Sequence, residues 1–306
     1  MEPSLSSEDF RPLAVDNSGT MTLPPKSISY WADASLRFRS NRMAFIGLVI
    51  LLLLIFFALV GPWLTPYTYY GTELANKNQP PNSEHWFGTD ELGRDLFTRT
   101  WYGARISLTV GITAAVIDLI IGVLWGGIAA FAGGKVDELM MRIADVLYGL
   151  PYLLTVIMLM VVMGSGLIPI IVALTIIGWI TMARIVRGQI LQLKRLEYVQ
   201  AAIALGASPR RILLKHLIPN AIAPILVTMT LTVPSAIFAE AFLSFLGLGV
   251  QAPVASWGTM AADGLPAMRY YPWRLFFPAT FISLAMFAFN LVGDGLRDAL
   301  DPKLRQ

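Results

Sequence analysis

The chain has 306 residues, of which 56% are hydrophobic and 14% are charged, and its formal net charge is +3. A soluble domain carries roughly 25% charged residues, so this composition indicates a membrane protein. The absence of cysteine excludes a disulfide scaffold and a thiolate metal site. Basic residues at the cytoplasmic ends of membrane spans explain the positive charge, so we expect contact with membrane lipid and not with nucleic acid.

The amino-terminal residues 1–42 are predicted to form a polar cytoplasmic tail without a signal peptide, because the first apolar run begins only at Met43. A spanning helix needs about 20 apolar residues. Residues 43–65 form the first predicted span, which Gly61 and Pro62 end. An extracytoplasmic segment, 66–105, follows, and the second span is predicted from Ile106 to Ala132.

The uncharged stretch from Val146 to Ala183 is too long for one span. Gly164-Ser165-Gly166 and Pro169 are predicted to divide it into the third and fourth spans. The fifth span is predicted from Ala221 to Leu248, and the sixth from Leu275 to Val292. The sequence therefore predicts an all-α integral membrane protein with six transmembrane helices.

Within this plan, residues 106–295 form the membrane core with helices two to five, and residues 275–306 supply the sixth helix and the carboxyl terminus. Lysine and arginine set the orientation, because they gather on the cytoplasmic side. Most of the 23 basic residues lie in the tail, at the carboxyl terminus and in the loop 184–220, whereas the outer loop 249–274 holds few. Both termini and the loop 184–220 are therefore expected in the cytoplasm.

The cytoplasmic loop 184–220 has the pattern of a helix, a tight turn and a second helix. Glu197 to Leu205 contains good helix formers, and Gly206 can adopt the left-handed conformation that ends such a helix. Ser208 and Pro209 suit the N-cap and the first position of the second helix. This second helix is expected to include Arg210, which suits acidic groups or anionic headgroups, and to stop at Pro219.

This loop carries Gln200-Ala201-Ala202, then Gly206, then His216-Leu217-Ile218-Pro219, and it resembles the coupling loop of bacterial ABC importer permeases. Gln200 stands where the family usually has glutamate, and His216 and Ile218 replace the usual isoleucine and leucine. The resemblance implies the type I ABC importer permease fold and a separate ATPase that docks on the loop. It implies no cofactor on this chain, since ATP and Mg²⁺ would be bound by the partner ATPases.

A second pattern narrows the resemblance. The stretch His85–Asp95, which contains Gly88-Thr89-Asp90 and Gly93-Arg94-Asp95, is similar to the signature of dipeptide, oligopeptide and nickel importer permeases, as is Leu243–Gly249. This resemblance implies a C-type permease subunit in the bacterial cytoplasmic membrane that forms half of a pathway for di- or oligopeptides. It also implies a heterodimer with a second homologous permease, two ABC ATPase subunits and an extracytoplasmic peptide-binding protein.

The external motif also has a local interpretation. Thr89 or Asp90 is predicted to cap a short helix, on which Leu92, Leu96, Phe97 and Trp101 form a membrane-facing stripe. Asp90, Arg94 and Asp95 would form ion pairs that either brace the outer mouth of the pathway or anchor this helix at the interface.

Two carboxylates fall within predicted spans. A charge there costs roughly 2.5–3.5 kcal/mol on insertion scales, so each is a candidate functional residue. Asp118 is expected near the midplane, where it lines the pathway, pairs with the partner permease or bonds within the bundle. Glu240 is expected near the outer face as a candidate gate, on a helix that Pro224 and Pro234 are expected to kink.

The alternatives concern the substrate and the energy source. The chain has no Gly-x-x-x-x-Gly-Lys-Ser/Thr run, so the energy comes from another chain or from an ion gradient. One alternative is a permease for nickel or another small solute, and another is an ion-coupled secondary transporter that uses Asp118. His85 and His216 are expected on opposite sides of the membrane, so neither a metal site nor an enzyme is predicted.

Overall fold

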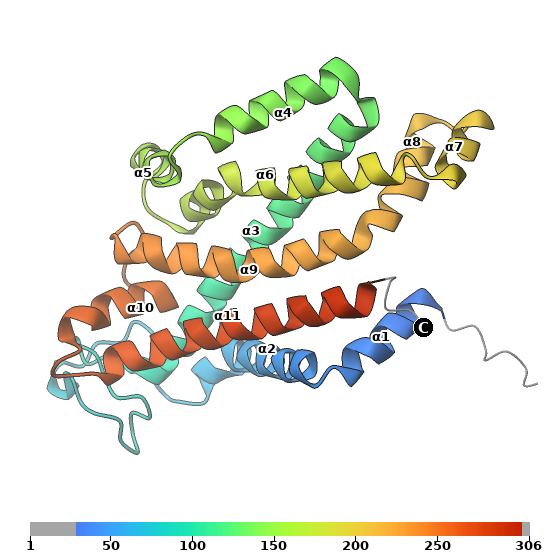
Figure 1. Ribbon diagram of the computed structural model, residues 1–306. Helices are drawn as coiled ribbons and strands as arrows, with labels where there is room; N and C mark the ends of the chain where they lie inside the picture. The colour runs from blue at the N-terminus through green and yellow to red at the C-terminus, as the bar shows by residue number, and fades with distance from the viewer. Residues whose placement is uncertain (1–28, 302–306) are drawn as a thin grey trace, which may run out of the picture.

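The computed structural model describes residues 29–301 as a bundle of α-helices (Figure 1). Within this range, five helices are long and apolar enough to cross a membrane, or up to six if the bent pair α4 and α5 forms one span. The unbroken candidates are α2 (Arg42–Val60, continued by a 3-10 turn to Trp63), α3 (Leu96–Ala132), α6 (Leu167–Leu193), α9 (Ile222–Phe245) and α11 (Trp273–Leu300). The predicted six spans are thus reached when α4 and α5 count as one.

The third span differs from the prediction. If α4 (Gly134–Tyr148) and α5 (Tyr152–Met163) count as one span, that span begins at Gly134 rather than at Val146, and it bends by 82° between the two helices. Pro151 explains the bend, because proline removes a backbone donor and disfavours helical geometry in the residue before it. The charged residues of α4 lie before the uncharged stretch from Val146, which alone defined the predicted span.

The break after α5 agrees with the prediction. Gly164 and Gly166 have φ values of 81° and 153°, which favour glycine, and α6 begins directly afterwards. Pro169 does not interrupt the chain, because it lies in the first turn of α6, where its missing N–H has no helical partner to lose.

Helix α3 begins at Leu96, well before the expected Ile106, so the last part of the segment 66–105 is helical. The side chain of Asp95 accepts a hydrogen bond from the backbone N–H of Thr98 and caps the helix. Helix α3 contacts α2, α6, α9, α10 (Trp257–Gly264) and α11, and Figure 1 shows it crossing behind α6, α9 and α11. It is the central element of the bundle.

Small residues allow α3 to approach its neighbours. A methyl group added at Gly122 would overlap Met182 of α6, and one added at Gly126 would overlap the backbone of Ala183. Association of helices in lipid depends on such close packing. The lipid tails are as apolar as leucine side chains, so the hydrophobic effect does not drive the helices together.

The two ends of the bundle differ. The short helices α7 (Glu197–Ala204) and α8 (Pro209–Arg211) lie at the same end as α1 (Tyr30–Ser40), whereas α10 and the loop before α3 lie at the opposite end (Figure 1). The hydroxyl of Tyr30 donates to the carbonyl of Leu300 at 3.2 Å. The two ends of the described chain therefore lie together, on the side that the basic residues assign to the cytoplasm.

Two neighbouring glycines of α3 provide a test of the α3–α6 contact. Gly126→Ala forces α3 away from Ala183 and should lower the thermal unfolding midpoint of the purified protein, because overpacking costs roughly 1–3 kcal/mol. Gly127→Ala is the matched control, since its added methyl group would lie 3.7 Å from Ile190, an ordinary contact distance. Equal midpoints for the two variants would show that the α3–α6 contact is loose.

Candidate functional site

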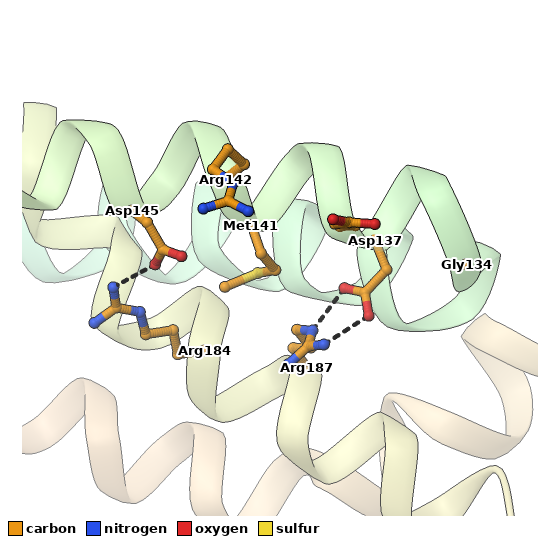
Figure 2. A pocket seen from close by; sticks show the side chains of 8 residues that line it. Gly134, Asp137, Met141, Arg142, Asp145, Arg184 and Arg187 are labelled. Atoms are coloured by element: carbon orange, nitrogen blue, oxygen red, sulfur yellow. Dashed lines mark hydrogen bonds and ion pairs between the residues drawn. The ribbon is translucent and has the colours of Figure 1, made fainter.

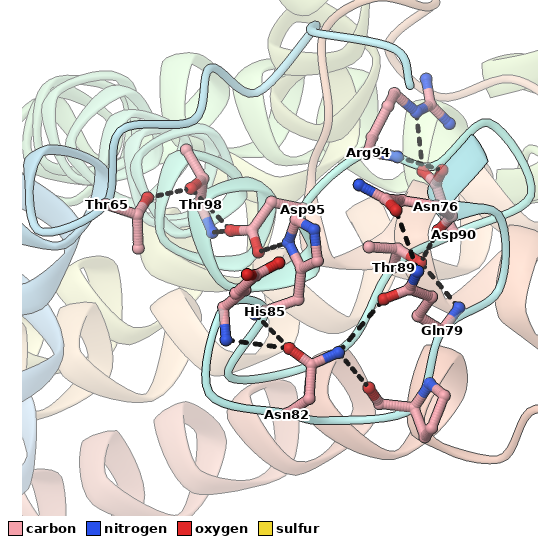
Figure 3. A network of polar contacts seen from close by, with 12 residues as sticks. Thr65, Asn76, Gln79, Asn82, His85, Thr89, Asp90, Arg94, Asp95 and Thr98 are labelled. Atoms are coloured by element: carbon pink, nitrogen blue, oxygen red, sulfur yellow. Dashed lines mark hydrogen bonds and ion pairs between the residues drawn. The ribbon is translucent and has the colours of Figure 1, made fainter. Parts of the chain in front are cut away.

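The external motif Gly88–Asp95 folds into a compact buried loop (Figure 3). Gly88 and Gly93 have φ values of 77° and 71°. A side chain at Gly88 would overlap the carbonyl of Gln79, and one at Gly93 would overlap the carbonyl of Glu73. Glycine is therefore required at both positions by conformation and by space.

The carboxylate of Asp90 is the centre of this loop. Its Oδ1 accepts from the backbone N–H groups of Leu92 at 2.9 Å and Arg94 at 3.0 Å, and its Oδ2 lies 2.6 Å from Nε of Arg94. Nε of Arg99 lies 3.5 Å from the same Oδ2. The predicted ion pair between Asp90 and Arg94 is thus present. The two arginines also act on Asp263 of α10: burial raises the pKa of the Asp263 carboxyl, and Arg99 and Arg94 oppose that rise.

Asp95 pairs with a different residue from the one predicted. Its Oδ1 lies 2.9 Å from Nδ1 of His85, and its Oδ2 accepts from both the backbone N–H and the hydroxyl of Thr98 at 2.7 Å. The expected cap at Thr89 or Asp90 was wrong. Thr89 instead bonds to the 76–79 segment: its hydroxyl accepts from the backbone N–H of Gln79 at 2.8 Å and donates to the carbonyl of Asn76.

The expected membrane-facing stripe was also wrong. Leu96, Phe97 and Trp101 are buried, and only Leu92 is exposed. The ring of Trp101 stacks on Phe57 of α2 at a centroid distance of 4.9 Å. These residues face the bundle because α3 extends through this region, so the motif braces the outer end of α3.

Glu240 links three helices. It is 0% exposed, and its carboxylate accepts hydrogen bonds from Ser107 of α3 at 3.0 Å, Ser244 of α9 at 2.8 Å and Ser256 at the N-cap of α10 at 2.7 Å. The predicted gate residue therefore faces no open space in this structure. Its geometry is that of a brace, since each buried polar group is paired.

Asp118 has a different environment. It is 4% exposed and lines a cavity of about 530 Å³ between α3, α5, α6 and α9. Helix α6 passes close by at Gly178, where an added methyl group would overlap the Asp118 carboxylate. The structure thus places Asp118 at a cavity, whereas Glu240 is enclosed.

A second hollow lies towards the cytoplasmic end, between α4 and α6 (Figure 2). Arg187 binds Asp137 through two hydrogen bonds of 2.6 and 2.7 Å, and Arg184 binds Asp145 at 2.8 Å. These pairs hold the charged α4 against α6. Sequence reasoning missed them because Asp137 and Asp145 lie between the second predicted span, which ends at Ala132, and the third, which begins at Val146.

The cytoplasmic loop has the predicted helix and turn. Helix α7 ends in a Schellman motif, in which the N–H of Gly206 donates to the carbonyl of Ile203 at 2.9 Å and that of Ala207 to the carbonyl of Ala202 at 3.0 Å. Gly206 has the left-handed φ of 76° that this motif requires. Ser208 caps α8 by accepting from the N–H of Arg211, with Pro209 at the first helical position. The side chain of Gln200 donates to the carbonyl of Lys194 at 2.7 Å.

Pro219 does not stop the second helix as expected. A π-helical turn, Ile212–Leu217, follows α8, and Pro219 opens a 3-10 turn that leads directly into α9. The wider turn before it accommodates a residue that has no N–H to donate. The cytoplasmic loop is therefore continuous with the helix that lines the Asp118 cavity.

The same loop combines an anchored side with an exposed side. Val199, Ile212 and Leu217 are buried in a cluster with Ile190 of α6. Leu205 is 88% exposed, and Ile203, Ala201 and Arg210 are also exposed. Exposed apolar side chains next to a rigid turn are typical of a protein-binding surface.

Comparison with known proteins assigns the family. Residues 122–306 match the model of the binding-protein-dependent transport system inner membrane component, and residues 29–81 match the N-terminal transmembrane domain of oligopeptide transport permease C. The chain belongs to this family of transport permeases. The permease is thus a multi-pass component of the bacterial inner membrane and not an enzyme.

Two relatives from Bacillus subtilis are similar over most of their length. The permease is 62% identical to the oligopeptide transport system permease protein over 97% of both chains. It is also 62% identical to the dipeptide transport system permease protein, over 92% of this chain and 88% of that one. The oligopeptide transport system permease protein of Escherichia coli K12 is 45% identical over 90% of this chain and 92% of that one.

Solved structures support the fold. The permease superimposes on a chain of the inward-facing methionine ABC transporter MetNI with a TM-score of 0.55 and 18% identity, over 65% of this chain and 94% of that chain. A second crystal form gives the same TM-score at 19% identity. The permease therefore has the expected ABC importer permease fold.

Several residues of these sites were not predicted. Ser107 and Ser256 give no signal in sequence, because a serine in an apolar stretch is common and its partner, Glu240, is far away along the chain. Gly178 reads as one more small residue in α6, although it makes room for Asp118. In each case the missing information is which faces of two helices meet.

The Glu240 brace has a testable consequence for stability. Glu240→Gln places an amide donor against serine hydroxyls that all donate to the native carboxylate, and Glu240→Ala removes the acceptor of these hydroxyls. Each buried hydroxyl left without an acceptor costs roughly 1–3 kcal/mol. We expect a lower thermal midpoint for both variants, measured on the purified permease. Ser235→Ala, an exposed hydroxyl on the same helix, should leave the midpoint unchanged. A stable Glu240→Ala variant would refute the brace.

Proposed function

We propose that this permease forms half of the translocation pathway of an ABC importer for di- or oligopeptides. The observation that carries the substrate class is its identity of 62% to both an oligopeptide and a dipeptide permease over nearly the whole chain. The fold of the solved importer supports the transport class, and the cavity between its helices supports a pathway role.

We further propose the partners. A second homologous permease would complete the pathway as a heterodimer, and an extracytoplasmic binding protein would deliver the peptide to the outer end. Two ABC ATPase subunits would bind ATP and Mg²⁺ and drive transport, while this chain holds no cofactor of its own. The exposed side of the loop 184–220, with Leu205, Ile203 and Ala201, is the surface on which one ATPase would dock.

The geometry of this surface suggests how movement passes to the membrane. Because Pro209 to Phe245 is helical almost without interruption, a shift of the turn at Gly206 would be transmitted along α9. The buried anchor of Val199 and Leu217 ties the same turn to α6. Both helices line the Asp118 cavity, so docking and pathway are joined by rigid elements.

The substrate is tested by uptake into proteoliposomes that contain this chain, its partner permease and both ATPases, with the binding protein added outside. We expect ATP-dependent uptake of a radiolabelled peptide, inhibited by an excess of unlabelled dipeptide or oligopeptide. Inhibition by nickel alone would favour the metal alternative. Uptake that persists without ATP but follows an ion gradient would favour a secondary transporter.

The coupling turn is tested by two substitutions at one position. Gly206→Val is strained at a φ of 76°, because β-branched residues avoid this region, whereas asparagine tolerates it. We expect Gly206→Val to abolish peptide uptake and peptide-stimulated ATPase activity while insertion into the membrane is retained. Gly206→Asn should keep most of both activities, since nothing lies within 4 Å of the added carbon. Normal uptake by Gly206→Val would refute the coupling role.

A further inference from the structure

The cavity beside Asp118 is polar on one side although it lies among membrane-spanning helices. Its volume is about 530 Å³, and α9 contributes Thr228, Thr232 and Ser235 to its wall, spaced so that they share one helix face. Thr181 adds a hydroxyl from α6 and Tyr152 one from α5. A row of hydroxyls on a spanning helix is costly towards lipid and suits a wet pathway.

The hydrogen bonds of this row decide its chemistry. The hydroxyl of Thr228 donates to the carbonyl of Pro224 at 2.7 Å, that of Thr232 to the carbonyl of Thr228 at 2.9 Å, and that of Ser235 to the carbonyl of Leu231 at 3.2 Å. Each of these hydroxyl protons is therefore used within α9. What remains available to a guest is the oxygen lone pairs, so this wall of the cavity accepts hydrogen bonds.

Asp118 adds the charge. Its side chain is 4% exposed, its Oδ1 has no hydrogen-bond partner, and within residues 29–301 the carboxylate makes no ion pair. No lysine or arginine lines the cavity in this part of the chain. Glu240, one residue beyond the cavity-lining Ala239, shows that this fold does pair a buried carboxylate elsewhere, through three hydroxyl donors. The free acceptor atoms of Asp118 are thus a specific feature of this cavity.

We propose that this cavity receives the α-ammonium group of the peptide as it crosses the membrane, with Asp118 as its counter-ion. An ammonium group offers three N–H donors and no acceptor, which matches the α9 face of the cavity, where the hydroxyl protons are already used, and the carboxylate of Asp118. The carboxyl end of a peptide would be repelled by the same wall. This inference rests on the proposed peptide substrate, and it assigns to the permease a selection for a free amino terminus.

The charge preference can be measured without a substrate. The chain has no cysteine, so Ser235→Cys places a single thiol of this chain in the cavity wall. In the assembled transporter, we expect a cationic methanethiosulfonate reagent to modify this thiol about tenfold faster than an anionic one, after correction for their rates with a small free thiol. Adding Asp118→Asn should bring the ratio close to one. A corrected preference for the cationic reagent that survives Asp118→Asn would overturn the proposal.

The nature of the cation is tested by protection. Peptide-loaded binding protein with ATP should slow modification of Ser235→Cys, whereas sodium chloride at matched ionic strength should not. Protection by sodium ions alone would identify an inorganic cation and overturn the assignment to the ammonium group. If the Asp118→Asn variant loses its partner permease on purification, the carboxylate pairs with that chain and the proposal also fails.

Transport supplies the decisive comparison. Uptake of a peptide with a free amino terminus is compared with that of its acetylated form, for peptides whose loading onto the binding protein has been confirmed by fluorescence. Asp118→Asn should reduce uptake of the free form about tenfold and leave that of the acetylated form unchanged. Asp298→Asn, an exposed carboxylate at the end of α11, is the control and should change neither.

The remaining outcomes are distinguishable. An equal loss for both peptides, or no loss for either, would overturn the role of Asp118. If the unaltered transporter takes up no peptide while the thiol still prefers the cationic reagent, the proposed peptide function fails and the cation-accepting cavity stands.

Discussion

The close contact between α3 and α6 determines where the rest of the molecule can lie. Gly122 and Gly126 let the backbones approach, and Gly178 on α6 leaves room for the carboxylate of Asp118. Because α3 also contacts α2, α9, α10 and α11, its position constrains where these helices lie. Helices in lipid gain little from the hydrophobic effect between themselves, so this packing is the main source of order.

The two carboxylates within the spans show opposite solutions to the same physical problem. Glu240 is surrounded by serine hydroxyls from three helices, and the cost of its burial is offset by those bonds. Asp118 has no such partners in the described chain and lies at a cavity. This contrast supports a structural role for Glu240 and the proposed ligand for Asp118.

The two ends of the bundle also differ in how they use polar residues. At the outer end, Asp90 and Arg94 form one buried pair and Asp95 and His85 form another, so polar contacts within the chain hold this loop together. At the cytoplasmic end, the turn at Gly206 presents exposed apolar side chains on a well-anchored base. Well-packed elements at both ends suit the proposed function, in which peptide delivery at the outer end and ATPase docking at the cytoplasmic end act on the same helices.

The sequence by itself determined the apolar spans and the turn of the cytoplasmic loop. Local geometry decides features that depend on residues close together in the chain. These features are the apolar stretch of α2, the break at Gly164–Gly166, and the helix caps at Gly206 and Ser208. Only the tertiary structure decided that the charged α4 packs against α3 and α6, that α3 starts at Leu96, and that the turn opened by Pro219 continues into α9. The surroundings of Glu240 and Asp118 were also decided by the tertiary structure. The environment of a buried carboxylate depends on which hydroxyls or glycines of other helices lie next to it, and residue spacing along one helix does not contain that information.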